Sequence, residues 1–124
     1  MKLSQNQLNH FEKHGFLLIR NLYEKKDMKR ITQWTDEVTN YPEAPNKYMM
    51  YFEESKLEKG KRILSRMEDI EPFHQGFSEL FVRGEIQKIT SQLFNEKALL
   101  FKDKINFKMP GGDGFKAHQD VQAG

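Results

Sequence analysis

The chain has 124 residues, 37% of them apolar and 31% charged, and its 20 basic and 18 acidic side chains give a formal net charge of +2. This composition predicts one soluble domain over residues 1–124, and the near-neutral charge argues against a dedicated nucleic-acid binder. The sequence has no cysteine, which excludes a disulfide framework or a thiolate metal site. Apolar runs such as Phe16–Ile19 and Ala98–Phe101 are far shorter than the roughly 20 residues that cross a bilayer. Met1–His10 resembles no secretory signal, so we expect a cytoplasmic protein without a membrane partner.

The first residues predict a helix over 4–14. Ser4, followed three residues later by Gln7, fits a capping box, and Gly15 is typical of the residue that follows a helix. The apolar run Phe16–Ile19 comes directly after this glycine and is too short for a buried helix. It therefore predicts a buried strand.

A second helix is predicted near 24–39, because apolar residues recur there at helical spacing and Asn40–Pro42 interrupts them. The stripe places Trp34 in the core rather than in a binding site; it consists of Leu22, Met28, Ile31, Trp34 and Val38. Residues 41–60 carry weaker signals, which favour a strand and an exposed loop.

The stretch 62–70 is compatible with either a short strand or a helical turn, and the sequence leaves both open. Two further helices are predicted at 74–82 and about 84–95, with Gly84 between them. Alternating polar and apolar residues predict a strand over 97–109. A glycine-rich turn at 110–114 follows, and Phe115–Asp120 is predicted to begin another strand.

The sharpest chemical signal is the triplet His118-Gln119-Asp120. On a strand, residues two apart point to the same face, so this imidazole and this carboxylate can converge on one ion. They would be two of the three ligands in the facial triad that binds non-haem Fe(II). Taken alone, the triplet favours a loop histidine beside a capping aspartate over a metal site.

Three other histidines offer weaker candidates. His10 and His14 are one helical turn apart, which formally suits a metal, but no carboxylate completes the set and a solvent-exposed position is expected. His74 follows Pro72-Phe73 at a helix start, where a capping or surface role is expected. On the strand over 103–109, alternation places Lys104, Asn106 and Lys108 on one face. The plain interpretation of that face is the charged outer side of an amphipathic strand.

The stretch from Leu100 to Asp120, with a polar strand, a glycine-rich turn and then H-x-D, resembles the phytanoyl-CoA dioxygenase family of Fe(II)- and 2-oxoglutarate-dependent oxygenases. The opening of the chain is similar too, since a short helix is followed by Gly15–Leu22 and then a long helix. Arg66–Glu68 lies where such proteins often carry a pocket-lining strand, although this match is loose. The resemblance covers nearly the whole chain and is most specific over 100–120.

This resemblance implies an α+β fold of N-terminal helices plus the first strands of a double-stranded β-helix (jelly-roll). It implies that His118 and Asp120 bind Fe(II), and that Lys104 and Asn106 face the pocket for 2-oxoglutarate. The implied activity is hydroxylation of a small-molecule substrate. Related halogenases lack the carboxylate ligand, so Asp120 favours hydroxylation over halogenation.

The family's distal histidine ligand and its 2-oxoglutarate-binding arginine lie beyond the H-x-D motif, whereas this sequence has no His after His118 and no Arg after Arg83. We therefore expect a truncated chain that by itself does not turn over 2-oxoglutarate. Open strand edges would then favour a homo-oligomer. Two alternatives remain open: a non-catalytic interaction or small-molecule-binding fragment of the same fold, and a jelly-roll binding module with a structural metal.

Overall fold

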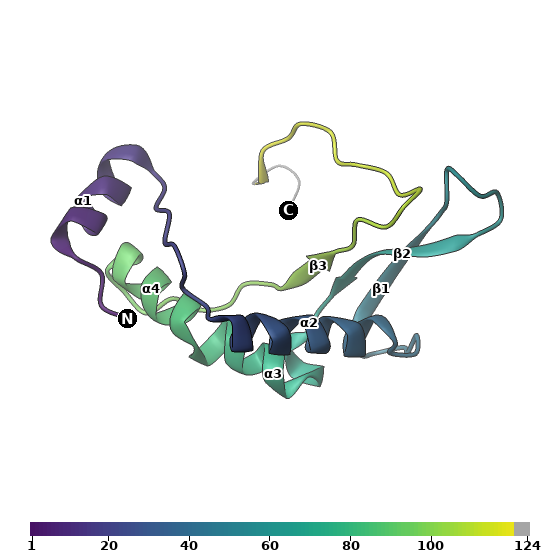
Figure 1. Ribbon diagram of the computed structural model, residues 1–124, viewed down its shortest axis with the longest axis horizontal. Helices are drawn as coiled ribbons and strands as arrows, with labels where there is room; N and C mark the ends of the chain where they lie inside the picture. Colours follow the sequence, from purple (N-terminus) through teal and green to yellow (C-terminus); the bar gives the residue numbers. More distant parts are fainter. Residues whose placement is uncertain (121–124) are drawn as a thin grey trace.

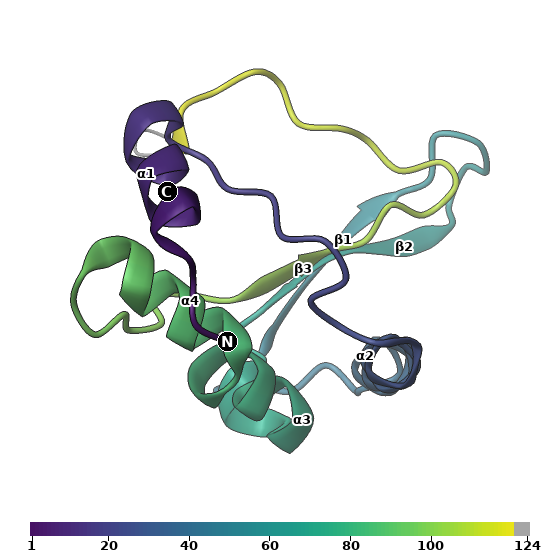
Figure 2. The same cartoon turned by 60° about the vertical axis from the view of Figure 1, so that its left-hand side comes forward.

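A computed structural model describes residues 1–120. In chain order the elements are α1 (Gln5–His14), α2 (Lys25–Thr39), β1 (Met49–Glu54), β2 (Arg62–Glu68), the 3₁₀ turn η1 (Glu71–Phe73), α3 (Gln75–Ser78), the π-helical turn η2 (Glu79–Arg83), α4 (Glu85–Phe94) and β3 (Lys104–Asn106). The sheet lies between α2 and α3 on one side and the C-terminal segment on the other (Figures 1 and 2). The fold is thus a mixture of helices and a small open antiparallel sheet, which confirms the coarse fold class.

Helix α1 forms as its end residues predict. The Ser4 hydroxyl accepts a hydrogen bond from the Gln7 N–H at 3.1 Å, and the Gln7 amide oxygen accepts one from the Ser4 N–H at 2.8 Å. At the other end Gly15 has φ of 77° and donates its N–H to the Phe11 carbonyl at 2.7 Å. These caps use only neighbouring residues, so the helix prediction over 4–14 is confirmed.

The predicted buried strand at Phe16–Ile19 is wrong. These residues form no strand, and Phe16 and Leu18 are 59% and 65% exposed. A strand needs a neighbour for its backbone N–H and C=O groups, and within residues 1–120 the segment pairs with none. It serves instead as the extended connection between α1 and α2.

The sheet has the order β1-β2-β3, with both pairs antiparallel. The sequence leaves 62–70 open between a short strand and a helical turn, and the structure shows a strand: Arg62–Glu68 form the central strand β2. The register shifts between Tyr51 and Phe52, where β1 and β2 form a bulge. Both outer strands retain one unpaired edge within the described part of the chain, because β2 alone has two neighbours.

The core lies where α2 and α3 pack on one face of this sheet. Met67, Ile70 and Val38 are fully buried, and Tyr48 and Phe77 complete the cluster. Trp34 packs against it, as the helical stripe predicts. The predicted helix near 24–39 is confirmed as α2, and the two predicted helices at 74–82 and 84–95 correspond to α3–η2 and α4, with Gly84 as the residue before α4.

The predicted strand over 97–109 is confirmed only at its centre, because β3 comprises Lys104–Asn106. Before β3, Leu99 and Phe101 are 79% and 89% exposed and have no strand partner within residues 1–120. After β3, the Phe107 N–H still donates to the Ser65 carbonyl at 2.8 Å, and then the chain turns away. The structure contains no helix within residues 1–120 that is long and apolar enough to span a membrane.

Candidate active site

The two faces of the sheet differ in chemistry. The register places Met50, Met67 and Ile105 side by side on the face that contacts the helices. The residues between them point to the other face, because side chains alternate along a strand. This polar face carries two rows across the strands: Tyr51, Arg66 and Asn106, and then Met49, Glu68 and Lys104.

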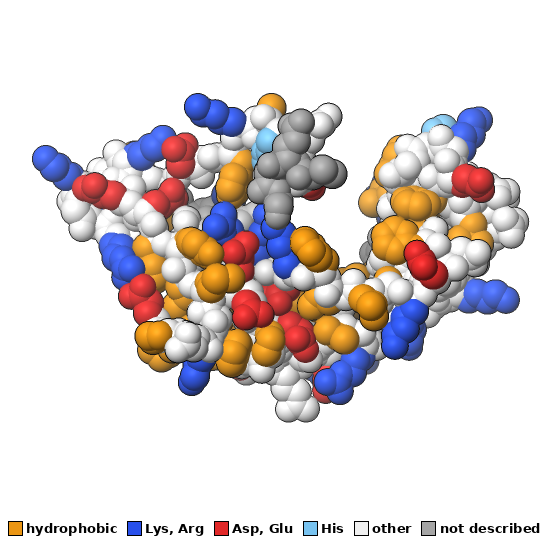
Figure 3. Space-filling view, turned by 180° about the vertical axis from the view of Figure 1, so that it is seen from behind, with side chains coloured by type: hydrophobic (Ala, Val, Ile, Leu, Met, Phe, Trp, Pro, Cys, Tyr) orange, Lys and Arg blue, Asp and Glu red, His pale blue; other side chains and the backbone are white. Residues whose placement is uncertain are grey.

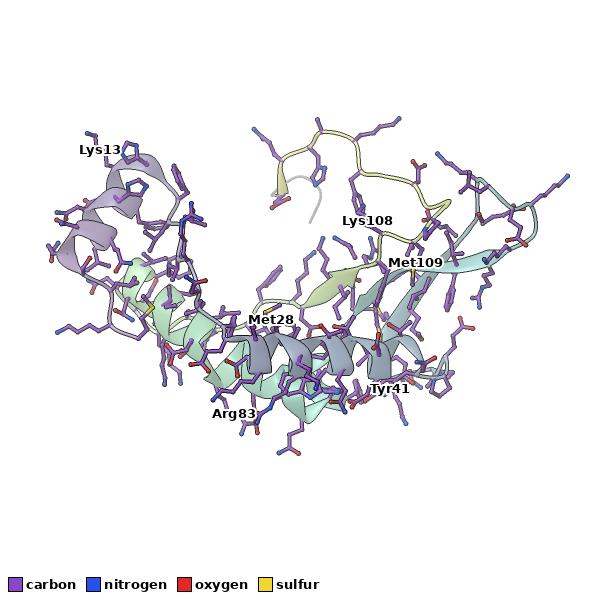
Figure 4. The ribbon with its side chains drawn as sticks, viewed as in Figure 1. Lys13, Met28, Tyr41, Arg83, Lys108 and Met109 are labelled. Carbon is purple, nitrogen blue, oxygen red and sulfur yellow. The ribbon has the colours of Figure 1, made fainter. Side chains whose placement is uncertain are left out.

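Lys104 and Asn106, the predicted 2-oxoglutarate-binding residues, thus share this polar face. Both are exposed, whereas Ile105 and Phe107 are half-buried against the core. Lys108 lies on the side of the sheet away from α2 (Figure 4). The predicted alternation along 103–109 therefore holds in space, although hydrogen bonding defines a shorter strand.

The glycine-rich turn after β3 docks onto the hairpin of β1 and β2. Gly111 has φ of 85°, and a Cβ there would lie 2.2 Å from the Ser55 hydroxyl oxygen, so only glycine fits. Its carbonyl accepts the Lys56 N–H at 2.8 Å. The Lys56 ammonium lies 3.0 Å from the Asp113 carboxylate, and this hydrogen bond, with one from the Gly114 N–H, lowers the pKa of Asp113. The turn therefore directs the chain back over the polar face.

His118 and Asp120 are brought together at the end of this returning segment. The His118 Nε2 and Asp120 Oδ1 atoms are 3.5 Å apart. The other ring nitrogen, Nδ1, lies 2.6 Å from the Lys116 carbonyl oxygen. Because a carbonyl only accepts hydrogen bonds, this contact places a proton on Nδ1, and Nε2 is the ring nitrogen that faces the carboxylate.

Two expectations about this segment need correction. Residues 115–120 form no strand, so the predicted strand starting at Phe115–Asp120 is wrong. The segment has left the sheet and has no neighbouring strand within residues 1–120 to pair with. His118 and Asp120 approach each other through a bend in the chain, and their side chains are 43% and 102% exposed. No third histidine or acidic residue within residues 1–120 joins them to form a metal-binding group.

Of the other histidines, His74 and His14 take the roles predicted for them. His74 precedes α3 and caps it, because its Nδ1 accepts the Phe77 N–H at 3.1 Å. Its side chain is only 8% exposed, and its Nε2 lies 2.7 Å from the Glu37 carboxylate. His14 is exposed on α1, whereas His10 is half-buried, and their rings lie 4.6 Å apart with a tilt of 43°. Neither histidine belongs to a possible metal group in the described residues.

Arg66 belongs to the stretch Arg66–Glu68 that the resemblance placed on a pocket-lining strand, although no role was predicted for the residue itself. Its guanidinium carbon lies 4.1 Å from the centre of the Tyr51 ring, on the polar face and next to Asn106. A cavity of about 270 Å³ opens here, between the sheet and the returning segment, and its lining includes Ser65, Arg66, Lys108 and Phe115. Residues 49–54 do not alternate polar and apolar side chains, so only the strand register shows that Arg66 lies on this face.

The larger hollow around this face is visible in the space-filling view, which shows a gap between α1 and the part of the molecule that carries the hairpin (Figure 3). A second cavity of about 350 Å³ lies at the other end of β2, and it is lined by Glu68, Asp69, Glu71 and Asp103 among others. The cavity toward the glycine-rich turn thus has a mixed wall, in which Arg66 and Lys108 lie with Glu53 and Asp113, whereas the cavity toward η1 is mainly acidic and, among the described residues, has Lys102 as its one cation.

Comparison with known proteins gives three relatives. The chain is 38% identical over 120 residues to a 2-aminoethylphosphonate dioxygenase from an uncultured bacterium, HF130_AEPn_1, and the aligned region covers 97% of this chain and 45% of that protein. It is 33% identical over 121 residues to a methylphosphonate hydroxylase from Gimesia maris, with 98% and 45% covered. It is 23% identical over 125 residues to a dioxygenase of Epichloe uncinata named lolE1, with 98% and 47% covered.

The chain thus spans less than half the length of these curated relatives. No solved structure matches it significantly. The sequence profile of phytanoyl-CoA dioxygenase (PhyH) matches residues 11–124, which include α2, the three strands and the H-x-D segment. On this match, the chain belongs to the phytanoyl-CoA dioxygenase family.

Proposed function

We propose that this protein acts as a non-haem Fe(II)- and 2-oxoglutarate-dependent dioxygenase that hydroxylates a small-molecule substrate. Family membership and the names of the relatives support the reaction class. The single observation that carries the proposal is the convergence of His118 Nε2 and Asp120 Oδ1 at 3.5 Å. Because Nδ1 holds a proton against the Lys116 carbonyl, Nε2 is the ring nitrogen that can bind a cation together with the Asp120 carboxylate.

In this proposal His118 and Asp120 hold the iron. The Nδ1 contact with the Lys116 carbonyl orients the ring, in the way that metal-binding histidines commonly donate their second N–H to a backbone carbonyl. Bound iron and 2-oxoglutarate would supply the oxidising chemistry that places oxygen in a substrate C–H bond. The chain's own contribution is to position these groups and to keep the imidazole in the binding tautomer.

Lys104 and Asn106 are proposed to bind 2-oxoglutarate. An ammonium and an amide on one sheet face can hold carboxylate oxygens by charge-assisted and neutral hydrogen bonds. Their shared exposure on the polar face supports this role. We further propose that β1, β2 and β3 are the first strands of a double-stranded β-helix, whose interior face is the polar one.

The proposed substrate is a small phosphonate. Two relatives that are at least 33% identical to this chain are named for phosphonate substrates, 2-aminoethylphosphonate and methylphosphonate. The polar face provides cations that suit such an anion, since Arg66, Lys104 and Lys108 lie on or beside it. The alternative, a non-catalytic interaction or small-molecule-binding fragment of the same fold, requires no metal at His118.

Metal binding distinguishes these two functions. We expect anaerobic calorimetry of the chain with Fe(II) or Mn(II) to show weak binding, because His118 and Asp120 leave the remaining coordination positions to water. We expect His118→Ala to abolish it. His14→Ala is the matched control, because His14 is also exposed but lies on α1 beside no carboxylate in the described residues. Metal binding that survives His118→Ala, or that His14→Ala removes equally, would contradict the metal assignment.

We also propose that copies of this chain associate. Phe16, Leu18, Leu99 and Phe101 expose between 59% and 89% of their surface, and the outer strands have unpaired edges. Burying such groups against a second copy removes apolar surface from water. Sedimentation equilibrium at micromolar concentration should therefore give a mass above the 14.7 kDa of one chain. A monomer that binds no hydrophobic dye would show this proposal to be wrong.

A further inference from the structure

The guanidinium of Arg66 lies on the polar face with few partners. Among residues 1–120 it donates no hydrogen bond, and its Nε is a buried nitrogen without an acceptor. Arg66 forms a loose ion pair with Glu68, whose Oε1 lies 3.7 Å from Nε, beyond hydrogen-bond range. The side chain as a whole is 30% exposed, so a ligand can reach its remaining N–H groups.

Stacking on Tyr51 prepares this guanidinium for a ligand. The ring centre lies 4.1 Å from the guanidinium carbon, and the stack occupies a face of the planar group. The N–H groups point outward in the plane, where they can meet two oxygens of one anion at once. A stacked arginine therefore loses little conformational freedom when it binds.

Lys108 brings a second cation to the same cavity of about 270 Å³. Its ammonium lies 4.7 Å from the centre of the Phe115 ring and pairs with no carboxylate within the described residues. The two carboxylates in the cavity wall have other partners. Asp113 pairs with Lys56 at 3.0 Å, and Glu53 accepts the Asp113 N–H at 3.1 Å. Within the described residues Arg66 has only its 3.7 Å ion pair with Glu68 and Lys108 has no ion pair, so they are the two cations in the cavity wall that a ligand can contact.

We propose that Arg66 and Lys108 form an oxyanion subsite that binds the phosphonate group of the substrate beneath the returning segment. The inference rests on the proposed function and divides the polar face into two parts. Lys104 and Asn106 do not line this cavity and stay available for 2-oxoglutarate. A phosphonate offers three oxygens and more charge than one carboxylate, so it matches a planar arginine fork assisted by an ammonium.

The test is a binding titration of the chain with methylphosphonate, and separately with 2-oxoglutarate, both without metal. We expect Arg66→Gln to weaken methylphosphonate binding about tenfold or more, as the loss of a charge-assisted bidentate contact implies. Lys108→Gln should weaken it severalfold, and 2-oxoglutarate binding should stay unchanged in both variants. Because Lys108 is exposed, its substitution tests the subsite even where Arg66→Gln disturbs folding.

Arg62→Gln is the matched control. Arg62 is on the same strand and also stacks on an aromatic ring of β1, with its guanidinium carbon 3.6 Å from the centre of the Phe52 ring, but it pairs with Glu43 and lies outside the cavity. Its substitution should leave methylphosphonate binding unchanged. The subsite is overturned if the unaltered chain binds no methylphosphonate, if neither variant weakens that binding, or if the variants weaken only 2-oxoglutarate. The metal titration at His118 is independent of this result, so the two proposals fail separately.

Discussion

Met67→Ala is expected to reduce the free energy of unfolding by about 3 kcal/mol, within the range of roughly 2–5 kcal/mol measured for such truncations in protein cores. Met67 is fully buried in the central strand, where it packs with Val38, Ile70 and Phe77. Truncation removes the transfer energy of its side chain and leaves a cavity that β2, held between two strands, cannot easily close. The total stability of a domain of this size is only about 5–15 kcal/mol.

Urea unfolding followed by circular dichroism measures this change. Met67→Leu should cost less than about 1.5 kcal/mol, because it nearly conserves the volume. Met49→Ala is the matched control, since Met49 is 46% exposed on the neighbouring strand β1. If Met67→Ala and Met49→Ala cost the same, Met67 is not the centre of the core.

Asp103→Ala is expected to cost about 2–4 kcal/mol through the loss of two hydrogen bonds to a charged acceptor. Asp103 is 8% exposed, and its carboxylate accepts the Ile70 N–H at 2.8 Å and the Glu71 N–H at 3.1 Å. These contacts fasten the segment before β3 to the corner between β2 and η1. Without the carboxylate, the buried Ile70 N–H has no acceptor.

The same unfolding measurement tests this contact, with Asp36→Ala as the control for removing an exposed carboxylate. Asp103→Asn should give a smaller loss than alanine, because the amide keeps one oxygen that can accept a hydrogen bond. A loss for Asp103→Ala no greater than that for Asp36→Ala would contradict the contact. Because Asp103 directly precedes Lys104, we also expect its loss to loosen β3 and the polar face.

The two cavities on the polar face lie at different ends of the central strand. Arg66 and Glu68 are two residues apart on β2; Arg66 lines the cavity toward the glycine-rich turn, and Glu68 lines the mainly acidic cavity toward η1. The returning segment, with His118 and Asp120 at its end, follows directly from the wall of the Arg66 cavity at Phe115. A phosphonate bound at Arg66 would therefore contact Phe115, which is three residues before the proposed metal ligand His118.

Local interactions explain what the sequence by itself determined. The capping box of α1 joins Ser4 to Gln7, and Gly15 ends the helix, so neighbouring residues suffice to define it. The stripe on α2 and the glycine-rich turn are likewise local, and both form where predicted. The H-x-D triplet identified the candidate ligands because its signal is chemical and needs no partner from elsewhere.

Tertiary structure decided the features whose partners are distant in sequence. Phe16–Ile19 has strand-like composition but no neighbouring strand in the described chain, so it stays extended and partly exposed. Asp103 lies 33 residues from Ile70, and alternation alone gave no reason to connect them. The resemblance had placed Arg66–Glu68 on a pocket-lining strand, but only the register showed that Arg66 lies between Tyr51 and Asn106. Strand pairing and register depend on long-range backbone hydrogen bonds, which a local pattern does not specify.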